Sequence, residues 1–273
     1  MKPIPVVFHL GPLQLHTYGL GLAITFWFAY RYLDRRLRAH GYPSEWLGPV
    51  TVRVIVAAIV GARVVHVLAH LSVYLAHPVQ ILEVWQGGLS SFGGLALGLT
   101  TGFYLAHKRL PQVRLAVLAD LVAPVLLASW AVGRLLGPQL MVRGGGHPTH
   151  QWFGLYYAGE VGKRLPVPLF QAAITFVVLL VVWRVERAAA AAGGPVGIVA
   201  SVALGLWGAG RFTEEHLWLA TGGPGHGGAL AVEIAGIALA AVGLGTAAWL
   251  FVRHRRTRRE VAAAAPPEPV GAR

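Results

Sequence analysis

The sequence predicts an all-α integral membrane protein with about seven transmembrane helices. Hydrophobic residues make up 55% of the chain and charged residues only 12%, about half of the charged share in average globular proteins. The mean hydropathy is +0.59. The apolar residues gather into blocks close to the ~20 residues that a membrane-crossing helix needs. A chain of 273 residues holds such helices with short loops and leaves no room for a large second domain.

Seven apolar blocks are expected to form the helices. They span residues 13–30, 47–71, 88–106, 115–136, 167–183, 195–212 and 228–252. Lys and Arg set the orientation, because cytoplasmic loops of membrane proteins are enriched in these residues. With the N-terminus outside, fourteen of them fall in cytoplasmic connections and four in outer ones. The sequence therefore predicts an N-terminus outside and a cytoplasmic C-terminus.

The expected organisation is a seven-helix transmembrane domain at 1–259 and a disordered cytoplasmic tail at 260–273. The longest outer connection, 137–166, contains the run GGGHPTH at 144–150. Loops of this length are usually functional or disordered. We find no internal repeat, which argues against an inverted-repeat transporter.

Charge and cysteine content exclude several function classes. The chain has 23 Lys and Arg against 11 Asp and Glu, a net charge of +12. The basic residues flank apolar blocks without the aromatic interleaving of a nucleic-acid site, so they indicate topology and attraction to anionic membrane lipid. With no cysteine, any thiol must come from a partner. His66 and His70 have helical ligand spacing but no third ligand, so we expect no metal and no cofactor.

Four arginines fall within or at the edges of the apolar blocks. Arg53 lies near a predicted cytoplasmic end, whereas Arg63, Arg134 and Arg211 lie toward the outer ends of their segments. An arginine near mid-bilayer costs at least ~2.5–3.5 kcal/mol on insertion scales, so these side chains need partners or a wet cavity. Forked guanidinium donors match phosphate oxygens. The pattern therefore favours a phosphate-binding site.

The alternative is a set of internal salt bridges with Asp120, Glu215 and Glu233. Arg211 and Glu215 are four residues apart on one helix face and are expected to pair. Asp120 and Arg134 lie ~21 Å apart along one helix. Asp120 therefore needs a neighbour from another segment.

Six short motifs resemble, in the same order, those of bacterial prolipoprotein diacylglyceryl transferases. Residues 8–20, FHLGPLQLHTYGL, resemble the family's opening "GP…H-W-Y-G". The others are 61–63 (GAR), 84–94 (VWQGGLSSFGG), 120–124 (DLVAP), 133–135 (GRL) and 208–215 (GAGRFTEE). They are similar to "G-G-R", "W-x-G-G-x-S-x-H-G-G", "D-x-x-A-P", the start of "G-R-x-G-N", and "G-x-x-R…E". Each motif is short, but their shared order is specific.

The resemblance implies an activity in the bacterial cytoplasmic (inner) membrane. That family moves a diacylglyceryl group from phosphatidylglycerol to the thiol of a lipobox cysteine in lipoprotein precursors, and releases glycerol phosphate. A thiolate attacks carbon and a phosphate ester leaves, so fixed guanidiniums in a low-dielectric site stabilise the charge that develops.

The resemblance also implies site residues. Arg134 and Arg211 are expected to stabilise the leaving phosphate, with Arg63 behind them. Glu215 and His16 are the candidates for the base, and Tyr18 for a donor to a phosphate or ester oxygen. Gly154, in the remnant QWFG of the family's "N-G-E-x-W-G", is expected at the phospholipid site.

Several family positions carry other residues in this chain. Phe92 replaces the histidine of "H-G-G", Gly137 the asparagine of "G-R-x-G-N", and Gln151 a glutamate. Gln171 replaces the last residue of the family's "H-P-x-Q-L-Y-E" block. Three hypotheses follow: an active transferase, a divergent paralogue that binds anionic phospholipid with a different or no transfer activity, and an unrelated small-solute transporter.

Overall fold

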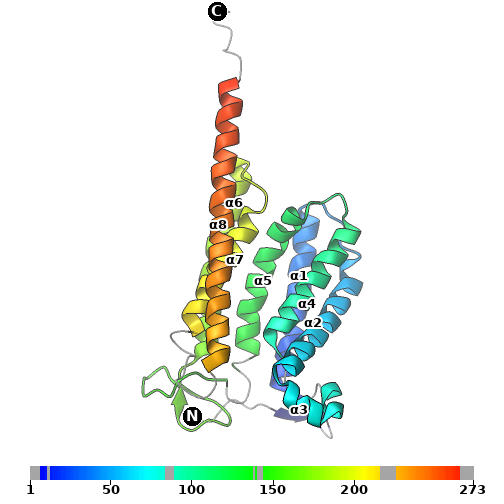
Figure 1. Ribbon diagram of the computed structural model, residues 1–273, viewed down its shortest axis with the longest axis vertical. Helices are drawn as coiled ribbons and strands as arrows, with labels where there is room; N and C mark the ends of the chain where they lie inside the picture. Colours follow the sequence, from blue (N-terminus) through cyan, green and yellow to red (C-terminus); the bar gives the residue numbers. More distant parts are fainter. Residues whose placement is uncertain are drawn as a thin grey trace, which may run out of the picture. The chain divides into compact units, whose positions relative to one another are not determined.

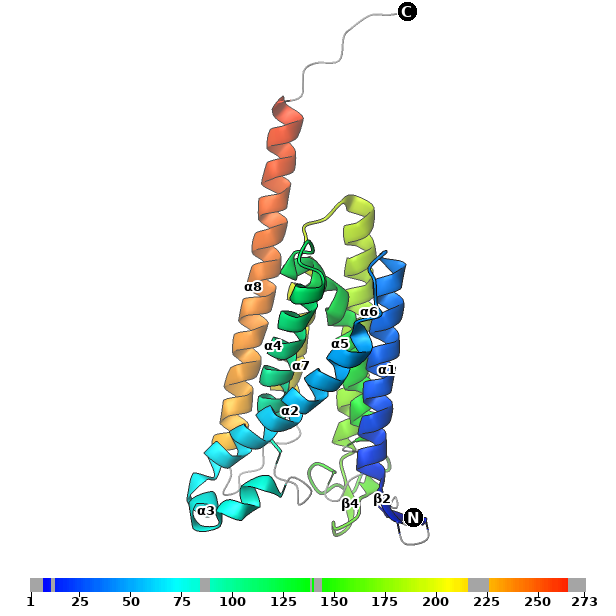
Figure 2. The ribbon, with the colours of Figure 1, turned by 90° about the vertical axis from the view of Figure 1, so that its right-hand side faces the viewer.

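The computed structural model describes residues 7–10, 13–83, 89–137, 139, 144–215 and 226–264. These residues are mostly helical, with two small antiparallel hairpins (Figures 1 and 2). The chain divides into two compact units. One consists of Met1–Ala29 and Ala119–Arg273, and the other of Tyr30–Leu118.

The elements in chain order are β1 (Val7–Leu10), β2 (Leu13–His16), α1 (Thr17–Ala39), α2 (Leu47–Ala69), α3 (Leu71–Ala76), the 3₁₀ helix η1 (Pro78–Leu82), α4 (Ser91–Arg109), α5 (Leu115–Leu136), β3 (Leu155–Tyr156), β4 (Lys163–Arg164), α6 (Val167–Ala192), α7 (Ile198–Glu214) and α8 (His226–Ala264).

The predicted helical fold is confirmed in its main features, but the prediction of a helix from residue 13 is wrong. Residues 13–16 form β2, which pairs with β1 through Leu10 and Leu13, and α1 begins at Thr17. At the other end, α8 continues to Ala264, through residues that we assigned to the tail. Apolar blocks mark only the lipid-compatible part of a helix, whereas arginine and alanine are strong helix formers in water as well. Residues 265–273 lie outside the described part.

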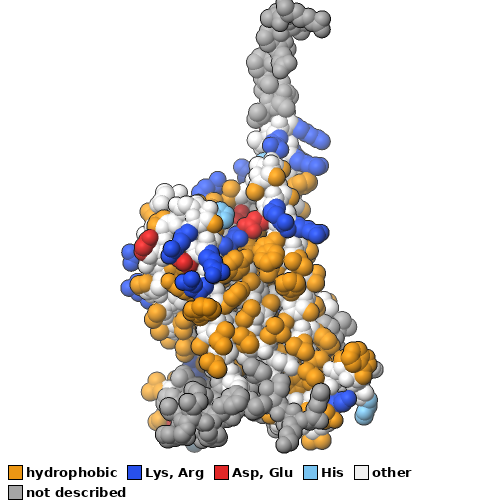
Figure 3. All heavy atoms as spheres, turned by 180° about the vertical axis from the view of Figure 1, so that it is seen from behind, with side chains coloured by type: hydrophobic (Ala, Val, Ile, Leu, Met, Phe, Trp, Pro, Cys, Tyr) orange, Lys and Arg blue, Asp and Glu red, His pale blue; other side chains and the backbone are white. Residues whose placement is uncertain are grey.

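Four described helices are long and apolar enough to cross a membrane. They are α2, α5, α6 and the Val232–Glu260 part of α8. Figure 3 shows basic side chains gathered toward the C-terminal end of α8, next to apolar side chains along its length. The distribution fits a helix that leaves the apolar phase at this end.

In the unit Tyr30–Leu118, α2 and α4 cross through small residues. The ideal Cβ of an alanine at Gly98 would lie 3.1 Å from the Ala58 Cβ, and Gly61 and Gly93 meet backbone to backbone. The Ser90 N–H donates to the Ala62 carbonyl at 2.9 Å, just before α4 begins. Small residues let helices in lipid approach this closely.

In the other unit, α7 and α8 run side by side (Figure 1), again through glycines. A Cβ at Gly208 would lie 2.6 Å from the Ala240 nitrogen and 2.8 Å from the Gly236 oxygen. Because both contacts are backbone atoms of α8, no side-chain rotation relieves them. The crossing fixes how the C-terminal turn of α7 faces α8.

We expect Gly208→Ala to destabilise the protein, since overpacking of a tight interface costs roughly 1–3 kcal/mol. The matched control is Gly245→Ala, also a helical position, where a Cβ meets nothing within 4 Å. There alanine should be neutral or stabilising, because it favours helix over glycine by about 1 kcal/mol. Thermal unfolding in detergent separates the two, and equal midpoints would contradict the close crossing.

Candidate functional site

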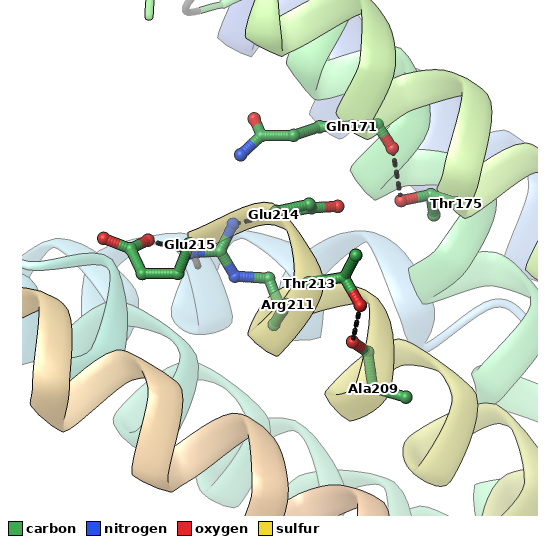
Figure 4. A network of polar contacts seen from close by, with 7 residues as sticks. All are labelled: Gln171, Thr175, Ala209, Arg211, Thr213, Glu214 and Glu215. Atoms are coloured by element: carbon green, nitrogen blue, oxygen red, sulfur yellow. Dashed lines mark hydrogen bonds and ion pairs between the residues drawn. The ribbon is translucent and has the colours of Figure 1, made fainter. Parts of the chain in front are cut away.

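The C-terminal turn of α7 places two carboxylates on one guanidinium (Figure 4). Arg211 Nη1 lies 2.6 Å from Glu214 Oε2, and Nη2 lies 3.3 Å from Glu215 Oε2. Residues three and four apart share a helix face, so the geometry of the helix itself brings Arg211 to both carboxylates. The Glu214 side chain is only 2% exposed, and those of Arg211 and Glu215 are 13% and 12% exposed. Exclusion from water strengthens both ion pairs.

Arg134, in the last turn of α5, lies beside this cluster. Arg211, Glu214, Tyr18 and Glu215 are its electrostatic neighbours. Within the described part of the chain its guanidinium forms neither a hydrogen bond nor an ion pair. A partly buried guanidinium of this kind is suited to an external anion, because its donors match two phosphate oxygens at once.

Arg134 rests on Trp130, which in turn contacts a second tryptophan on α7. Its guanidinium lies over the Trp130 ring, 4.4 Å from the centroid, a favourable cation–π contact. Trp130 in turn meets Trp207 of α7 edge to face, with centroids 5.1 Å apart. Trp207 lies one turn before Arg211, so each arginine is one turn beyond a tryptophan of this pair. The aromatic pair thereby couples the two arginine-bearing helices.

Asp120 fixes the start of α7. Its carboxylate accepts the N–H of Gly197 at 2.6 Å and the N–H of Ala200 at 2.8 Å. These are among the donors that an α-helix leaves unsatisfied at its N-terminus, and an aspartate there also complements the helix dipole. The prediction that Asp120 has a partner from another segment is confirmed, but the partner is a helix end instead of an arginine. Asp120 therefore sets the axial position of α7.

The loop between α5 and α6 is ordered around Tyr157. Its hydroxyl donates to Gln139 Oε1 at 2.7 Å, and burial raises the pKa of Tyr157 to about 12. The Leu165 N–H donates to the His147 carbonyl and the Gly146 N–H to the Leu165 carbonyl, both at 2.9 Å. The loop is thus an organised part of the fold between residues 144 and 166.

The structure brings together four of the predicted site residues: Arg134, Arg211, Glu215 and Tyr18. The expected pairing of Arg211 with Glu215 is confirmed. Tyr18 is 39% exposed, and its ring would lie 3.4 Å from a Cβ at Gly137. The closer contact of such a Cβ is with the Gly133 carbonyl oxygen, at 2.6 Å, so the backbone of α5 itself favours glycine here.

The other three predicted residues have different surroundings. Arg63 belongs to the unit Tyr30–Leu118, where its guanidinium lies over Tyr74 and donates to the carbonyls of Gln80 and Ile81. Gly154 is buried in the α5–α6 loop, where a Cβ would meet the Thr149 methyl group at 2.7 Å. His16 is paired with Val7 in the hairpin β1–β2, and only its backbone is described.

Sequence reasoning missed Glu214 and the contact between Trp130 and Trp207, and it named Gln171 only as a departure from a family motif. The sequence contained a signal for the pairing of Glu214 with Arg211, since residues three apart share a helix face. Gln171 is 2% exposed, and its backbone carbonyl accepts a hydrogen bond from the Thr175 hydroxyl at 2.8 Å. The contact between the two tryptophans had no signal in the sequence, because Trp130 and Trp207 lie on different helices and their spacing does not indicate that they touch.

The fold and this cluster define a class: a multi-pass helical membrane protein with a buried arginine–carboxylate group and a second arginine beside it. The sequence profile of the prolipoprotein diacylglyceryl transferases matches residues 5–249, and this chain belongs to that family.

Relatives named phosphatidylglycerol–prolipoprotein diacylglyceryl transferase are similar over most of the chain. The protein of Tolumonas auensis is 31% identical over 67% of this chain and 72% of its own. That of Geobacter sulfurreducens is 31% identical over 77% and 80%. That of Cupriavidus pinatubonensis is 29% identical over 94% of both chains.

We expect Asp120→Ala to lower the thermal stability, because loss of a helix N-cap typically costs 0.5–2 kcal/mol. Asp120→Asn should fall between the alanine variant and the wild type, since its side-chain oxygen still accepts one of the two α7 N–H groups. Unfolding midpoints in detergent measure both effects. An alanine variant as stable as the wild type would mean that α7 is positioned without Asp120.

Proposed function

We propose that this protein transfers the diacylglyceryl group of phosphatidylglycerol to the cysteine thiol of lipobox-containing precursor proteins, in lipoprotein biogenesis. Family membership over residues 5–249 supports the activity. The observation that carries the assignment to these residues is Arg134. It is a partly buried guanidinium without an ion pair among the described residues, beside a second arginine that two carboxylates already hold.

Arg134 is proposed to bind the lipid phosphate, and Arg134 and Arg211 together are proposed to stabilise the charge that develops on the leaving phosphate. Tyr18 is a neighbour of Arg134, so its hydroxyl is proposed to donate to a phosphate or ester oxygen. We do not place the phosphate on Arg63, because its donors face the carbonyls of Gln80 and Ile81. Gly154 is assigned to the packing of the outer loop.

Glu215 is the proposed base. Its contact with Arg211 is longer than that of Glu214, at 3.3 Å against 2.6 Å, so Glu215 is the less tightly held carboxylate. Glu215 takes the proton of the thiol, and the sulfur bonds to the diacylglyceryl carbon that carries the phosphate. The bond between this carbon and the phosphate oxygen breaks, and its electron pair stays on the oxygen. Glycerol phosphate leaves. Protonated Glu215 no longer competes for Arg211, whose Nη2 is then available to the developing charge.

His16 is the second candidate for the base, because it precedes Tyr18 by two residues. A variant of each candidate distinguishes them: Glu215→Gln removes the proton acceptor on α7, and His16→Gln removes the one before α1. General-base catalysis contributes typically 10²–10⁴-fold, so the variant of the true base should show the loss.

We further propose seven crossings of a bacterial cytoplasmic (inner) membrane, with the N-terminus outside, and residues 1–259 as the transmembrane domain. Seven described helices of 17 residues or more support the count: α1, α2, α4, α5, α6, α7 and α8. The fourteen-to-four distribution of Lys and Arg supports the orientation.

A reporter fused after Arg259 should be cytoplasmic, and a tag inserted at Gly159 should be accessible from outside the cell. Gly159 is an exposed loop position between β3 and β4, so the insertion disturbs no helix. Cysteine labelling in intact cells gives an independent readout, because the native chain has no cysteine. Both markers on the same side would contradict the proposed topology.

Arg134→Ala should lower transfer from labelled phosphatidylglycerol to a lipobox peptide by about 10²–10³-fold, the usual loss for one donor to a developing oxyanion. Arg134→Lys should recover only part of it, since the forked geometry is gone. Arg187→Ala is the matched control, because Arg187 is an exposed arginine that caps the Trp183 carbonyl of α6. Unchanged transfer in both Arg134 variants would contradict the proposal that Arg134 binds the lipid phosphate.

The second candidate function is a paralogue that binds anionic phospholipid with a different or no transfer activity. The residues at Phe92, Gly137, Gln151 and Gln171 favour it, since each replaces a polar or charged residue of the family motifs. The wild-type protein distinguishes the two functions. Binding of phosphatidylglycerol that depends on Arg134, without transfer to any lipobox peptide, would select the paralogue.

A further inference from the structure

We propose that Trp130 is a positioning residue for Arg134. Its indole face holds the guanidinium in place of a carboxylate, so that the N–H donors of Arg134 stay available to the lipid phosphate. The inference rests on the proposed function, which makes Arg134 the phosphate-binding residue. It concerns a tryptophan outside the six motifs that this chain shares with its family.

Arg134 is held by an aromatic ring, whereas Arg211 is held by carboxylates. The guanidinium carbon of Arg134 lies 4.4 Å from the centroid of the Trp130 ring. Within the described part of the chain this guanidinium forms neither a hydrogen bond nor an ion pair. Arg211 instead pairs with Glu214 and Glu215, at 2.6 and 3.3 Å. The two guanidiniums are therefore stabilised by different chemistry.

The partner of a guanidinium decides what else the guanidinium can bind. A carboxylate neutralises its charge and occupies the N–H donors that a phosphate needs. The face of an aromatic ring attracts the cation through its quadrupole without neutralising it, and tryptophan gives the strongest attraction of this kind. A tryptophan therefore suits an arginine that must remain in an apolar region and still bind an incoming anion.

The ring of Trp130 is itself held by a second tryptophan. Trp207 of α7 meets it edge to face, with centroids 5.1 Å apart and ring planes at 89°. The indole nitrogen of Trp130 is buried and has no hydrogen-bond partner among the residues that the structure describes. Aromatic packing and not a hydrogen bond therefore fixes the ring. Phenylalanine at this position would break no hydrogen bond within this part of the chain.

The first test replaces the ring and measures binding of phosphatidylglycerol in mixed micelles. Binding should weaken in the order Trp, Phe, Leu at position 130, with a loss of about tenfold in Trp130→Leu, the scale of one desolvated cation–π contact. In the Arg134→Ala background the same change should have no further effect, because the ring has no cation to hold. Losses that add in W130L/R134A would overturn the inference, since a merely structural tryptophan acts with or without Arg134.

Fluorinated tryptophans at position 130 separate the ring face from the N–H group. Fluorine withdraws electrons, so it weakens the attraction of the ring for a cation and makes the N–H a better donor, with little change of shape. Binding of phosphatidylglycerol should fall steadily with the number of fluorine atoms. Unchanged binding would leave Trp130 as a packing residue, and tighter binding would make its N–H the ligand. Either result contradicts a positioning role through the ring face.

Trp130→Glu tests the comparison with a carboxylate directly. A glutamate four residues before an arginine forms a favourable ion pair on a helix. This variant should therefore unfold at a higher temperature than Trp130→Leu and yet bind phosphatidylglycerol less tightly, because the new carboxylate occupies the donors of Arg134. Tighter binding by Trp130→Glu than by Trp130→Leu would show that the donors need not be free.

Trp249→Leu is the matched control. Trp249 also lies beneath an arginine, with the Arg253 guanidinium 5.2 Å from its ring centroid, but it is 56% exposed on α8. The helices α7 and α8 are antiparallel, and Gly205 meets Leu244, so Trp249 lies toward the start of α7 and away from Arg211. This variant should bind phosphatidylglycerol as the wild type does.

Transfer to a lipobox peptide, recorded beside binding, keeps the inference distinct from the proposed function. If the wild type binds phosphatidylglycerol but transfers nothing, the transferase assignment fails and the binding series still decides the role of Trp130. A wild type that binds no phosphatidylglycerol would overturn both. If the leucine or glutamate variant does not accumulate in folded form, the phenylalanine and fluorinated variants, which keep an aromatic ring, decide the outcome.

Discussion

The double ion pair of Arg211 with Glu214 and Glu215 is the interaction on which the site depends. A guanidinium in a largely apolar unit is stable only where its charge is matched nearby, and the last turn of α7 provides both partners within four residues. With Arg211 satisfied by its own helix, Arg134 on the neighbouring α5 is the arginine left to attract an anion. The difference in pairing gives the two arginines different roles.

The surrounding structure keeps that turn of α7 in place from both ends. Asp120 anchors the N-terminus of α7 to α5 through two backbone amides, and the glycine crossing with α8 fixes its rotation near Gly208. The contact of Trp207 with Trp130 then ties the arginine-bearing end of α7 to that of α5. The three contacts are chemically unrelated, yet each constrains the separation of Arg134 and Arg211.

The departures from the family motifs are of two kinds. Gly137 and Gln171 have a structural explanation. A Cβ at Gly137 would lie 2.6 Å from the Gly133 carbonyl oxygen, and Gln171 is 2% exposed, where a neutral amide costs less to bury than a charge. Phe92 is different: it lies in α4 of the other unit and is 45% exposed, and nothing in the structure explains its replacement of a histidine. Gln151 is an exposed loop residue whose N–H bonds to Thr149, and its replacement of a glutamate is likewise unexplained.

The sequence by itself determined the membrane class, the family resemblance, and the pairing of Arg211 with Glu215. Apolar block length and the i, i+4 spacing of a helix are local properties, so they can be read from residues close together in the chain. Only the tertiary structure decided that Asp120 caps a helix 77 residues away, that Glu214 is the closer of the two partners of Arg211, and that Trp130 lies between Arg134 and Trp207. These contacts depend on how each helix is rotated against its neighbours. That rotation follows from packing along the whole interface, which no local pattern of residues specifies.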